Sequence, residues 1–393
     1  MPHDPSAPSA AHTPPHGPGR SHTGAAPAPV RPEPPTPARL VARLLGRLAL
    51  ALALGGAGGW VFAWLDFPLP WMLGAVCFTL VSALAGAPLE VPNGLRNGML
   101  LILGVLIGSG FTPDILAHVH RWALSIALVL AYTVALAFGG AWFFRRLAGY
   151  GRTDAFFAGL PGGLAAVIFI GAEVGADLRR LSIIHSVRIV AVCFVIPFWI
   201  RFAEGVSAAA ARRAGGLAMG LPDALLLTGC ALAGYYAARR LKLAAPFLLG
   251  PLFLSAAAHL SGLTAAKPPG DLVIAAQVVV GSAIGCRFVG LALRRVLRTV
   301  GLGMASAALM VASAFAMAWA VHRLTGLPYN AVLLALAPGG LPEMTLIALS
   351  LQIDLALVVS HHLVRVLFIN VGVPLLFRLL YGDPTPDAPT AAP

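Results

Sequence analysis

Long apolar stretches separated by short polar connections cover almost the whole of this chain. Each run has about 20 predominantly apolar residues, the length that an α-helix needs to cross a hydrocarbon core of about 30 Å. The ten runs lie at 48–65, 69–86, 95–111, 122–144, 181–200, 222–238, 245–262, 272–290, 299–321 and 355–377. The pattern predicts an all-α polytopic membrane protein with about ten spanning helices.

Both ends of the chain and one internal stretch lack this pattern. Residues 1–38 are rich in proline and poor in large aliphatic residues, so they cannot bury enough apolar surface to offset their ordering entropy. We expect a disordered, proline-rich cytoplasmic tail there and a first membrane repeat over 39–203. A connecting loop over 204–220, a second membrane repeat over 221–380 and a disordered tail over 381–393 follow.

One block of the first half returns in the second half at a fixed spacing. GLPGGL at 159–164 precedes HSVR at 185–188, and ALAPGGL at 335–341 precedes HLVR at 362–365. Chance similarity between apolar segments is the alternative, but further pairs keep the same offset of 177 positions. These pairs are Gly104 and Gly281, Gly108 and Gly285, Asp177 and Asp354, and Pro197 and Pro374. The chain is therefore a tandem duplication, and two membrane halves of this kind usually form a site at their interface.

Each half contains a shorter element rich in glycine and proline, at 155–173 and 330–350. If this element crosses the membrane, the two halves are parallel. If it dips in and returns, or is one limb of a broken helix, the second half is inverted. Inversion gathers most of the flanking Arg and Lys on one side, which the positive-inside rule favours. We expect two inverted repeats, each with about five spanning helices plus a broken or re-entrant Pro-Gly-Gly element.

The Pro-Gly-Gly motif lies at a depth where irregular backbone needs a protein or water environment, because each unsatisfied peptide group in lipid costs several kcal/mol. The motif can form a tight turn that needs a positive φ angle at glycine. It can also free amides and carbonyls at half-helix ends to bind an ion or an anionic solute. Since the motif occurs in both halves, we predict a binding role for Gly162, Gly163, Gly339 and Gly340.

Each half also has a histidine and an arginine within an apolar run. His185 and Arg188 are three residues apart and share one helix face, and so do His362 and Arg365. An arginine inside the membrane faces protein or water because its insertion into lipid costs a few kcal/mol. The two arginines either cap half-helix carbonyls and pair with aspartates, or bind a solute. The histidines titrate near neutral pH and could couple a proton to solute movement.

Three carboxylates are candidates for that coupling. Glu343 follows the second Gly-Gly turn, where the first half has Ala166. A desolvated carboxylate can exchange a proton. The alternative is a loop carboxylate paired with an arginine. Asp177 and Asp354 occupy equivalent positions, where they either neutralise the buried arginines or take part in coupling.

Composition narrows the function classes further. With 58% hydrophobic and 11% charged residues, the chain is not an ordinary soluble globule, in which roughly a quarter of residues are charged. The net charge of +12 comes from small basic clusters beside helix ends, such as Arg145 and Arg146, which are typical of topology signals rather than of nucleic-acid contacts. Arg39, Arg43 and Arg47 before the first span predict a cytoplasmic N-terminus.

Two further features concern packing and chemistry. The Gly-x-x-x-Gly pairs Gly104 with Gly108 and Gly281 with Gly285 predict small-residue faces for close helix contact. No His, Cys or acidic set has metal-ligand spacing, and no nucleophile stands beside a base, so we expect no metal, no other cofactor and no enzymatic activity.

The duplicated Pro-Gly-Gly block, LPWMLG at 69–74 with its copy APFLLG at 245–250, and PGGLPEM at 338–344 resemble the AbrB family of bacterial membrane proteins over about residues 45–380. That family is often labelled as ammonia monooxygenase or as a transcriptional regulator, which implies a role in regulating gene expression. It is also similar to the cation/proton antiporter and anion transporter folds, which have inverted repeats and interrupted helices. The absence of a copper or iron ligand set in the sequence does not support the monooxygenase label.

The sequence thus predicts a multi-pass protein of the bacterial inner membrane that transports or senses a small anionic or zwitterionic solute, with proton coupling. The alternative is a membrane-embedded regulator of gene expression that acts through protein partners without transport. The expected partners are the lipid bilayer and a small-molecule solute or ion, without direct nucleic-acid binding, and a homo-oligomer is left open. The site is expected where the two Pro-Gly-Gly elements meet.

Overall fold

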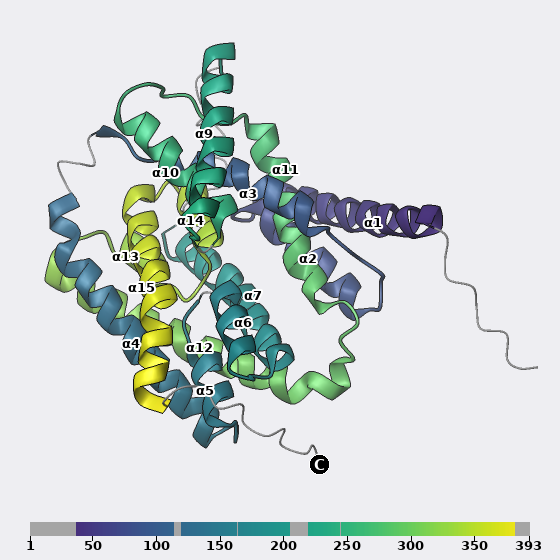
Figure 1. Ribbon diagram of the computed structural model, residues 1–393, viewed down its shortest axis with the longest axis vertical. Coiled ribbons are helices and arrows are strands. Elements are labelled where there is room, and N and C mark those ends of the chain that lie inside the picture. The colour runs from purple at the N-terminus through teal and green to yellow at the C-terminus, as the bar shows by residue number, and fades with distance from the viewer. Residues whose placement is uncertain (1–36, 114–118, 163, 205–218, 244, 382–393) are drawn as a thin grey trace, which may run out of the picture. The chain divides into compact units, whose positions relative to one another are not determined.

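The computed structural model describes residues 37–113, 119–162, 164–204, 219–243 and 245–381. These ranges contain helices, turns and coil, without a β-strand (Figure 1). Most of the predicted terminal tails and of the predicted loop at 204–220 lies outside these ranges. Pro37, Ala38 and Tyr381 were predicted to belong to the disordered tails but are helical. The fold described below is that of the unit from Arg43 onward.

The duplication predicted from the sequence is visible in the helix bounds. The first half contains α1 (Pro37–Trp64), α2 (Pro70–Leu84), α3 (Asn93–Gly108), η2 (Val119–Trp122), α4 (Ala123–Arg146), α5 (Arg152–Gly159), α6 (Leu164–Glu173) and α7 (Leu178–Glu204). The second contains α9 (Leu221–Arg240), α10 (Pro246–Leu260), α11 (Gly270–Gly285), η3 (Cys286–Phe288), α12 (Leu293–Thr325), α13 (Tyr329–Leu336), α14 (Leu341–Ser350) and α15 (Leu355–Tyr381). Five helices recur with identical lengths: α2 as α10, α3 as α11, α5 as α13, α6 as α14 and α7 as α15.

The duplication extends to an unusual backbone conformation. Leu69, just before α2, has a left-handed φ of 47°, and Ala245, just before α10, has a φ of 56°. Each residue precedes the proline that begins the next helix, Pro70 or Pro246, and proline disfavours the right-handed helical conformation at the residue before it. A left-handed conformation is uncommon outside glycine. Its recurrence at equivalent positions shows that the two halves share local structure as well as sequence.

Six helices among the described residues are long and apolar enough to cross a membrane, namely α1, α4, α7, α11, α12 and α15. They coincide with six of the ten predicted spans. The other four predicted spans fall on α2, α3, α9 and α10, of which α2 and α10 have only 15 residues and α3 has 16. At 1.5 Å per residue, these three are shorter than a hydrocarbon core of about 30 Å. The chain is accordingly an all-α, multi-pass membrane protein.

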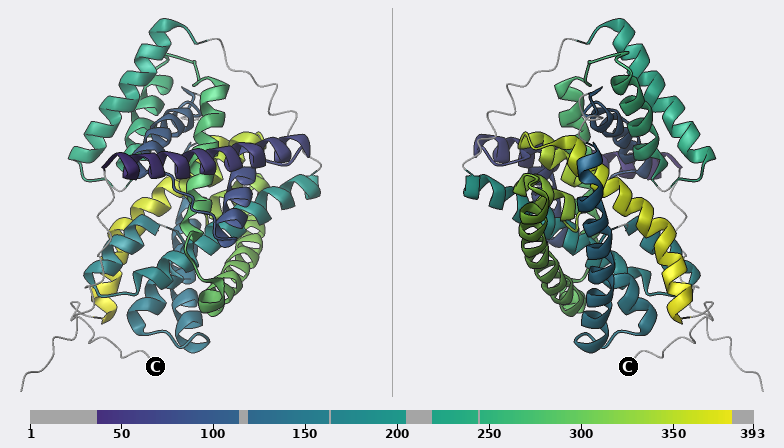
Figure 2. Two further views of the ribbon diagram at one scale, coloured as in Figure 1. Left: turned by 90° about the vertical axis from the view of Figure 1, so that its right-hand side faces the viewer. Right: turned by 90° about the vertical axis from the view of Figure 1, so that its left-hand side faces the viewer.

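The helices pack into two bundles, and each bundle draws on both halves. In the first bundle α3 lies against α10 and α11, α11 lies against α2, and α9 pairs with α10. In the second bundle α12 lies against α7, α13 and α4, and α15 lies against α13, α14 and α4. Figure 1 shows α9 beside α10 and α5 beside α4, and Figure 2 shows the same pairs from two other sides. Contacts between the bundles are few by comparison, chiefly α14 with α3 and α2 with α7.

The predicted Gly-x-x-x-Gly faces hold the first bundle together. A Cβ atom on Gly104 of α3 would lie 2.6 Å from the carbonyl oxygen of Leu248 in α10. One on Gly281 of α11 would lie 2.6 Å from the carbonyl oxygen of Met72 in α2. The second glycine of each motif also makes a close contact farther along the same helix: Gly108 with the carbonyl oxygen of Leu252 in α10, and Gly285 with the backbone nitrogen of Leu80 in α2. The predicted close packing is confirmed, and in each case the partner helix comes from the other half of the chain.

Each predicted Pro-Gly-Gly element is a broken helix. α5 and α13 have eight residues each, and α6 and α14 have ten. The first limbs end at the residue before proline: Leu160 has a ψ of 130° and Ala337 a ψ of 134°, both extended values. Proline imposes this extended conformation on the preceding residue, so the breaks follow directly from Pro161 and Pro338.

Candidate functional site

The two Pro-Gly-Gly turns, although far apart in sequence, meet in the structure. Gly162 has a φ of +107°, and a Cβ atom built on it would lie 3.9 Å from the carbonyl oxygen of Gly339. Gly163, which was predicted as part of the binding site, lies outside the described residues. The predicted convergence of the two elements is therefore observed at Gly162 and Gly339.

Side chains from the first turn of α14 fold back over the glycines of the second turn. A Cβ atom on Gly339 would lie 2.7 Å from the Cε atom of Met344. One on Gly340 would collide with the Oε2 atom of Glu343. Gly340 is the N-cap residue of α14, so Glu343 places its carboxylate at the positive end of that helix.

Arg365 of α15 binds the end of the first limb in the second half. Its Nη1 donates to the carbonyl oxygens of Ala337 at 2.8 Å and Leu336 at 3.3 Å, and its Nη2 donates to that of Gly339 at 3.1 Å. Carbonyls at a helix C-terminus have no intrahelical partner and carry partial negative charge. Arg365, which is only 3% exposed, satisfies them. The predicted capping role is thus observed for Arg365.

His362 continues the same network. Its Nε2 lies 2.8 Å from the carbonyl oxygen of Leu334, and its Nδ1 lies 2.8 Å from Nη2 of Arg365. A carbonyl only accepts and a guanidinium only donates, so Nε2 carries the proton and Nδ1 accepts. A second proton on Nδ1 would displace Arg365. The geometry therefore fits a neutral histidine that positions the arginine.

The equivalent pair in the first half has different surroundings. Arg188 is 1% exposed, and its Nη1 donates to the Sδ atom of Met310 at 3.7 Å, a weak acceptor. His185 donates from Nδ1 to the carbonyl oxygen of Leu181 at 3.0 Å, and its Nε2 is buried without a partner. Nε is unpartnered in both arginines, but only Arg365 has three carbonyls. Arg188 therefore keeps buried donor capacity that the described residues do not fill.

Two polar side chains, from α4 and α12, lie close to Met310, the partner of Arg188. The hydroxyl group of Tyr132 lies 2.7 Å from the Oγ atom of Ser313 and 3.3 Å from the carbonyl oxygen of Met310. Tyr132 is within electrostatic reach of Arg365, and Arg365 is within reach of Arg188. No carboxylate forms an ion pair with either guanidinium within 4.0 Å in the described part of the chain. Tyr132 and Ser313 were not predicted from the sequence, where their only signal is a hydroxyl group within an apolar run.

Glu343 faces two arginines of the first bundle. Its side chain is 8% exposed, and Oε2 has no hydrogen-bond partner. Arg96 of α3 and Arg287 of η3 are within electrostatic reach of it, but neither forms an ion pair with it within 4.0 Å in the ranges described. Neither arginine was predicted, because each stands alone at a helix end. The carboxylate thus lies opposite positive charge across the boundary between the bundles.

Asp177 and Asp354 occupy helix N-termini. Oδ1 of Asp177 accepts from the backbone N–H of Arg180 at 3.0 Å, and the side chains of these two residues form an ion pair at 2.9 Å. Oδ1 of Asp354 accepts from the backbone N–H of Leu357 at 3.0 Å. Each aspartate therefore caps its helix, α7 or α15, at the third helical residue. Among the described residues, neither aspartate pairs with the buried arginines, and their coupling role stays a prediction.

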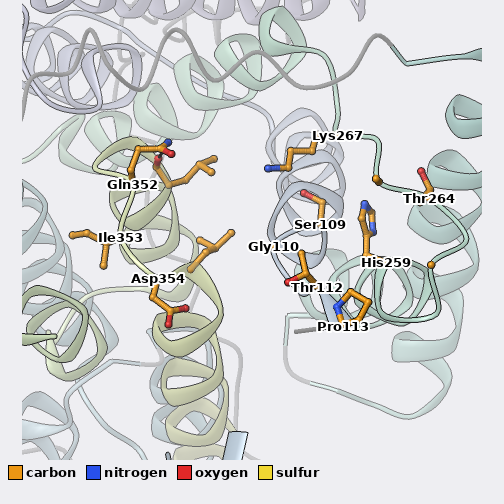
Figure 3. A pocket seen from close by; sticks show the side chains of 14 residues that line it. Ser109, Gly110, Thr112, Pro113, His259, Thr264, Lys267, Gln352, Ile353 and Asp354 are labelled. Atoms are coloured by element: carbon orange, nitrogen blue, oxygen red, sulfur yellow. Dashed lines mark hydrogen bonds between the residues drawn. The ribbon is translucent and has the colours of Figure 1, made fainter. Parts of the chain in front are cut away.

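A cavity of about 490 Å³ lies on the boundary between the bundles. Figure 3 shows Gln352, Ile353 and Asp354 of the α14–α15 turn on one side and Ser109, His259 and Lys267 of the first bundle on the other. Of the residues that line this cavity, only Asp354 was predicted from the sequence as a site residue. Its lining mixes charged and neutral polar groups, so it can admit water and small ions.

A second cavity, of about 310 Å³, lies on the same boundary. Arg179, Ser182 and Ser186 line it from α7, and Arg287 lines it from η3. Arg287 is equivalent in the duplication to Gly110, which lines the first cavity. The two cavities therefore use corresponding parts of the two halves. Across the described ranges, no three His, Cys, Asp or Glu side chains gather as a metal site would require.

Comparison with known proteins identifies the family. The family model described as "Transition state regulatory protein AbrB" matches residues 71–381. The chain belongs to the AbrB family. The AbrB-family match spans both halves, as the resemblance in the sequence predicted.

Two AbrB-family relatives are similar over most of their length. "Uncharacterized protein YhjN" of Bacillus subtilis (strain 168) is 27% identical over 338 residues, which cover 79% of this chain and 87% of the relative. "Putative regulator AbrB" of Escherichia coli (strain K12) is 25% identical over 315 residues, which cover 80% of this chain and 90% of the relative. No solved structure matches the chain.

Proposed function

We propose that this AbrB-family protein is a secondary transporter of a small anionic solute in the bacterial inner membrane. The observation that carries the proposal is the buried guanidinium of Arg188, whose Nε has no partner among the described residues. It lies within electrostatic reach of Arg365, which binds the carbonyl oxygen of Gly339 in the second Pro-Gly-Gly turn. Two buried cations that have no carboxylate partner among the described residues make a strongly positive environment, because burial weakens dielectric screening. An anion would supply the missing acceptors.

The two arginines have different roles in this proposal. Arg365 is occupied by the carbonyls of α13 and the ring of His362, so it holds the second turn in shape. In the described part of the chain, Nη1 of Arg188 has a thioether as its partner, and in this proposal Arg188 is the group that binds the solute. Gly162 and Gly339 allow the backbone of the two turns to approach that solute closely.

Helix directions support the inversion of the two halves. Gly104 lies against Leu248 and Gly108 against Leu252, so α3 and α10 run in the same direction. Only a short connection joins α2 to α3, so consecutive crossings would make these helices antiparallel. The equivalent helices α2 and α10 then point in opposite directions. The electrostatic proximity of Arg96 near the start of α3 and Arg287 just after α11 supports the same arrangement.

The two bundles and the two cavities support alternating access. The bundles make few mutual contacts, and both cavities lie on their boundary. If the halves are inverted, cavities formed by corresponding parts open toward opposite sides of the membrane. Rocking one bundle against the other would then connect the site to each cavity in turn. Glu343 would sense this movement, because it faces Arg96 and Arg287 of the other bundle.

Ligand-dependent thermal stabilisation of the purified protein tests the proposal. Small carboxylates, phosphonates, amino acids and ammonium are screened over about pH 5.5 to 8.5, since a ligand that binds the folded state raises the melting temperature in a saturable way. We expect an anion to stabilise the wild-type protein and not the Arg188→Gln variant. Stabilisation that is equal in both proteins would place the solute elsewhere and refute the role of Arg188.

A second candidate function is regulation without transport. The descriptions of the matching family and of the E. coli relative both refer to regulation. In that case the protein acts through a protein partner that binds its cytoplasmic segments. Deleting residues 2–37 separates the two functions: a regulator loses its effect on gene expression, whereas a transporter keeps solute uptake.

A further inference from the structure

A third cavity lies apart from the boundary between the bundles. It has a volume of about 690 Å³ and is formed where α4 ends and α5 begins. Its lining consists of Phe138, Ala141, Trp142, Arg145 and Arg146 from α4, with Arg152 and Ala155 from α5. None of these residues belongs to the site at the Pro-Gly-Gly turns, so the cavity needs a separate explanation.

The cavity changes from apolar to basic along α4. Phe138, Ala141, Trp142 and Arg145 follow the spacing i, i+3, i+4, i+7 and therefore share one face of the helix. Phe138 is 46% exposed and Trp142 is 61% exposed, so both rings are accessible beside the cavity. This order, aromatic side chains followed by cations at the helix end, matches an amphiphile that has hydrocarbon at one end and negative charge at the other.

The cations at the basic end are not neutralised by the protein. Asp154, the nearby carboxylate in the first turn of α5, interacts with Arg180 and with the backbone N–H of Asp177. Within the described ranges, no carboxylate lies within 4.0 Å of Arg145, Arg146 or Arg152. All three arginines are exposed, so their charges are available to a ligand.

We propose that this cavity binds the headgroup of an anionic phospholipid that carries two phosphates. Arg145, Arg146 and Arg152 bind the phosphates, because guanidinium groups form bidentate hydrogen bonds to phosphate oxygens. Phe138 and Trp142 lie along the start of the acyl chains. Three cations exceed the charge of one phosphodiester and suit a dianionic lipid better than a monoanionic one. A free phosphate would leave the aromatic half of the cavity empty.

Lipid binding to the delipidated full chain in detergent tests this proposal. Native mass spectrometry follows titrations with diphosphatidylglycerol, phosphatidylglycerol, phosphatidylethanolamine and inorganic phosphate. The test variant is Arg145→Gln/Arg146→Gln/Arg152→Gln. The control variant, Arg239→Gln/Arg240→Gln/Arg323→Gln, removes the same charge from the ends of α9 and α12.

We expect diphosphatidylglycerol to bind most tightly. Each basic residue near an anionic lipid surface contributes roughly a fivefold change in affinity, so the test variant should bind this lipid about 100-fold more weakly. The control variant should keep wild-type affinity. Equal losses in both variants would show non-specific charge attraction and overturn the proposal. Phosphate that binds as tightly as the lipid, or competes fully with it, would overturn the lipid assignment.

A charge-preserving variant distinguishes loss of lipid binding from misfolding. Arg145→Lys/Arg146→Lys/Arg152→Lys keeps the three cations but loses the bidentate geometry. We expect it to retain more affinity than the glutamine variant and less than the wild-type protein. A lysine variant that binds as weakly as the glutamine variant while melting like the wild-type protein would contradict binding through charge.

Discussion

Gly162 and Gly339 come from turns 177 residues apart in sequence, yet a Cβ atom on Gly162 would touch the carbonyl oxygen of Gly339 at 3.9 Å. That carbonyl also accepts a hydrogen bond from Arg365 at 3.1 Å. One peptide group of the second half therefore contacts both the turn of the first half and a buried cation. The contact between the two halves at this point involves the backbone carbonyl of Gly339, which is present whatever side chain this residue has.

Gly162→Ala should weaken both folding and solute binding. The φ of +107° is rarely adopted by residues other than glycine and should cost about 1–3 kcal/mol. Gly149→Ala is the matched control, because Gly149 also has a positive φ, +73°, but has nothing within 4 Å of its Cβ position. Thermal melts should fall for both variants, whereas ligand stabilisation should be lost only in Gly162→Ala. Loss of ligand binding in both variants would assign the effect to general destabilisation.

Arg365→Gln should destabilise the fold, whereas Arg188→Gln should not. Arg365 donates to three carbonyls and one ring nitrogen, and hydrogen bonds to charged groups contribute about 1.5–3 kcal/mol each, so its removal should destabilise the fold by several kcal/mol. Arg188 has a thioether partner at Nη1, so its replacement should leave the melting temperature unchanged or raise it. Differential scanning fluorimetry in detergent measures both. A large drop for Arg188→Gln would mean that its role is structural.

Glu343→Gln should separate binding from proton coupling. The substitution keeps the size of the side chain but removes the proton exchange that coupling requires. In proteoliposomes, we expect solute exchange to continue while solute-driven proton movement stops. A Glu343→Gln protein that still acidifies the vesicle interior would exclude Glu343 as the coupling group. Glu90→Gln is the comparison, since Glu90 is partly exposed and forms an ion pair with Arg47 at 3.3 Å, away from the candidate site, and should leave coupling unchanged.

Gly104→Val should disrupt the contact between α3 and α10. The added Cβ atom would approach the carbonyl oxygen of Leu248 to 2.6 Å, and overpacking of this kind costs about 1–3 kcal/mol or more. Gly98→Val on the same helix is the control, because nothing lies within 4 Å of that Cβ position. The melting temperature should fall clearly only for Gly104→Val. Similar melts for both variants would argue against close packing of these helices.

A topology reporter fused within 204–220 tests the inversion of the halves. If the Pro-Gly-Gly elements leave an odd number of crossings in each half, this loop lies outside the cytoplasm. An alkaline phosphatase fusion should then be active and a fluorescent protein fusion dark. The reverse pattern would favour parallel halves. Fusions before Arg39 serve as the reference, because Arg39, Arg43 and Arg47 predict a cytoplasmic N-terminus.

Much of the fold could be predicted because the duplication repeats local signals. Pro161 and Pro338 predict the helix breaks, and Gly104 and Gly281 predict close packing, since both effects depend on the residue itself. The partners of those glycines could not be predicted. Exchange of helices between halves depends on tertiary packing, which periodicity along one helix does not encode.

The candidate site was predicted less completely. His185-x-x-Arg188 and His362-x-x-Arg365 have the same spacing, so nothing local distinguishes the cap from the incompletely bonded cation. Their difference arises from which backbone lies opposite each arginine. The N-cap role of Asp177 could have been predicted, because an aspartate directly before a helix is a well-known N-cap signal.

The exchange of helices between the halves also affects biosynthesis. The glycine face of α3 packs on α10, which is synthesised about 140 residues later. At about 5–20 residues per second, α3 waits on the order of ten seconds in the membrane before its partner emerges from the ribosome. The first half therefore cannot complete its packing until α10 and α11 of the second half have been synthesised. During this interval the glycine face of α3 needs another partner in the membrane, such as lipid or a membrane chaperone, until α10 has been inserted.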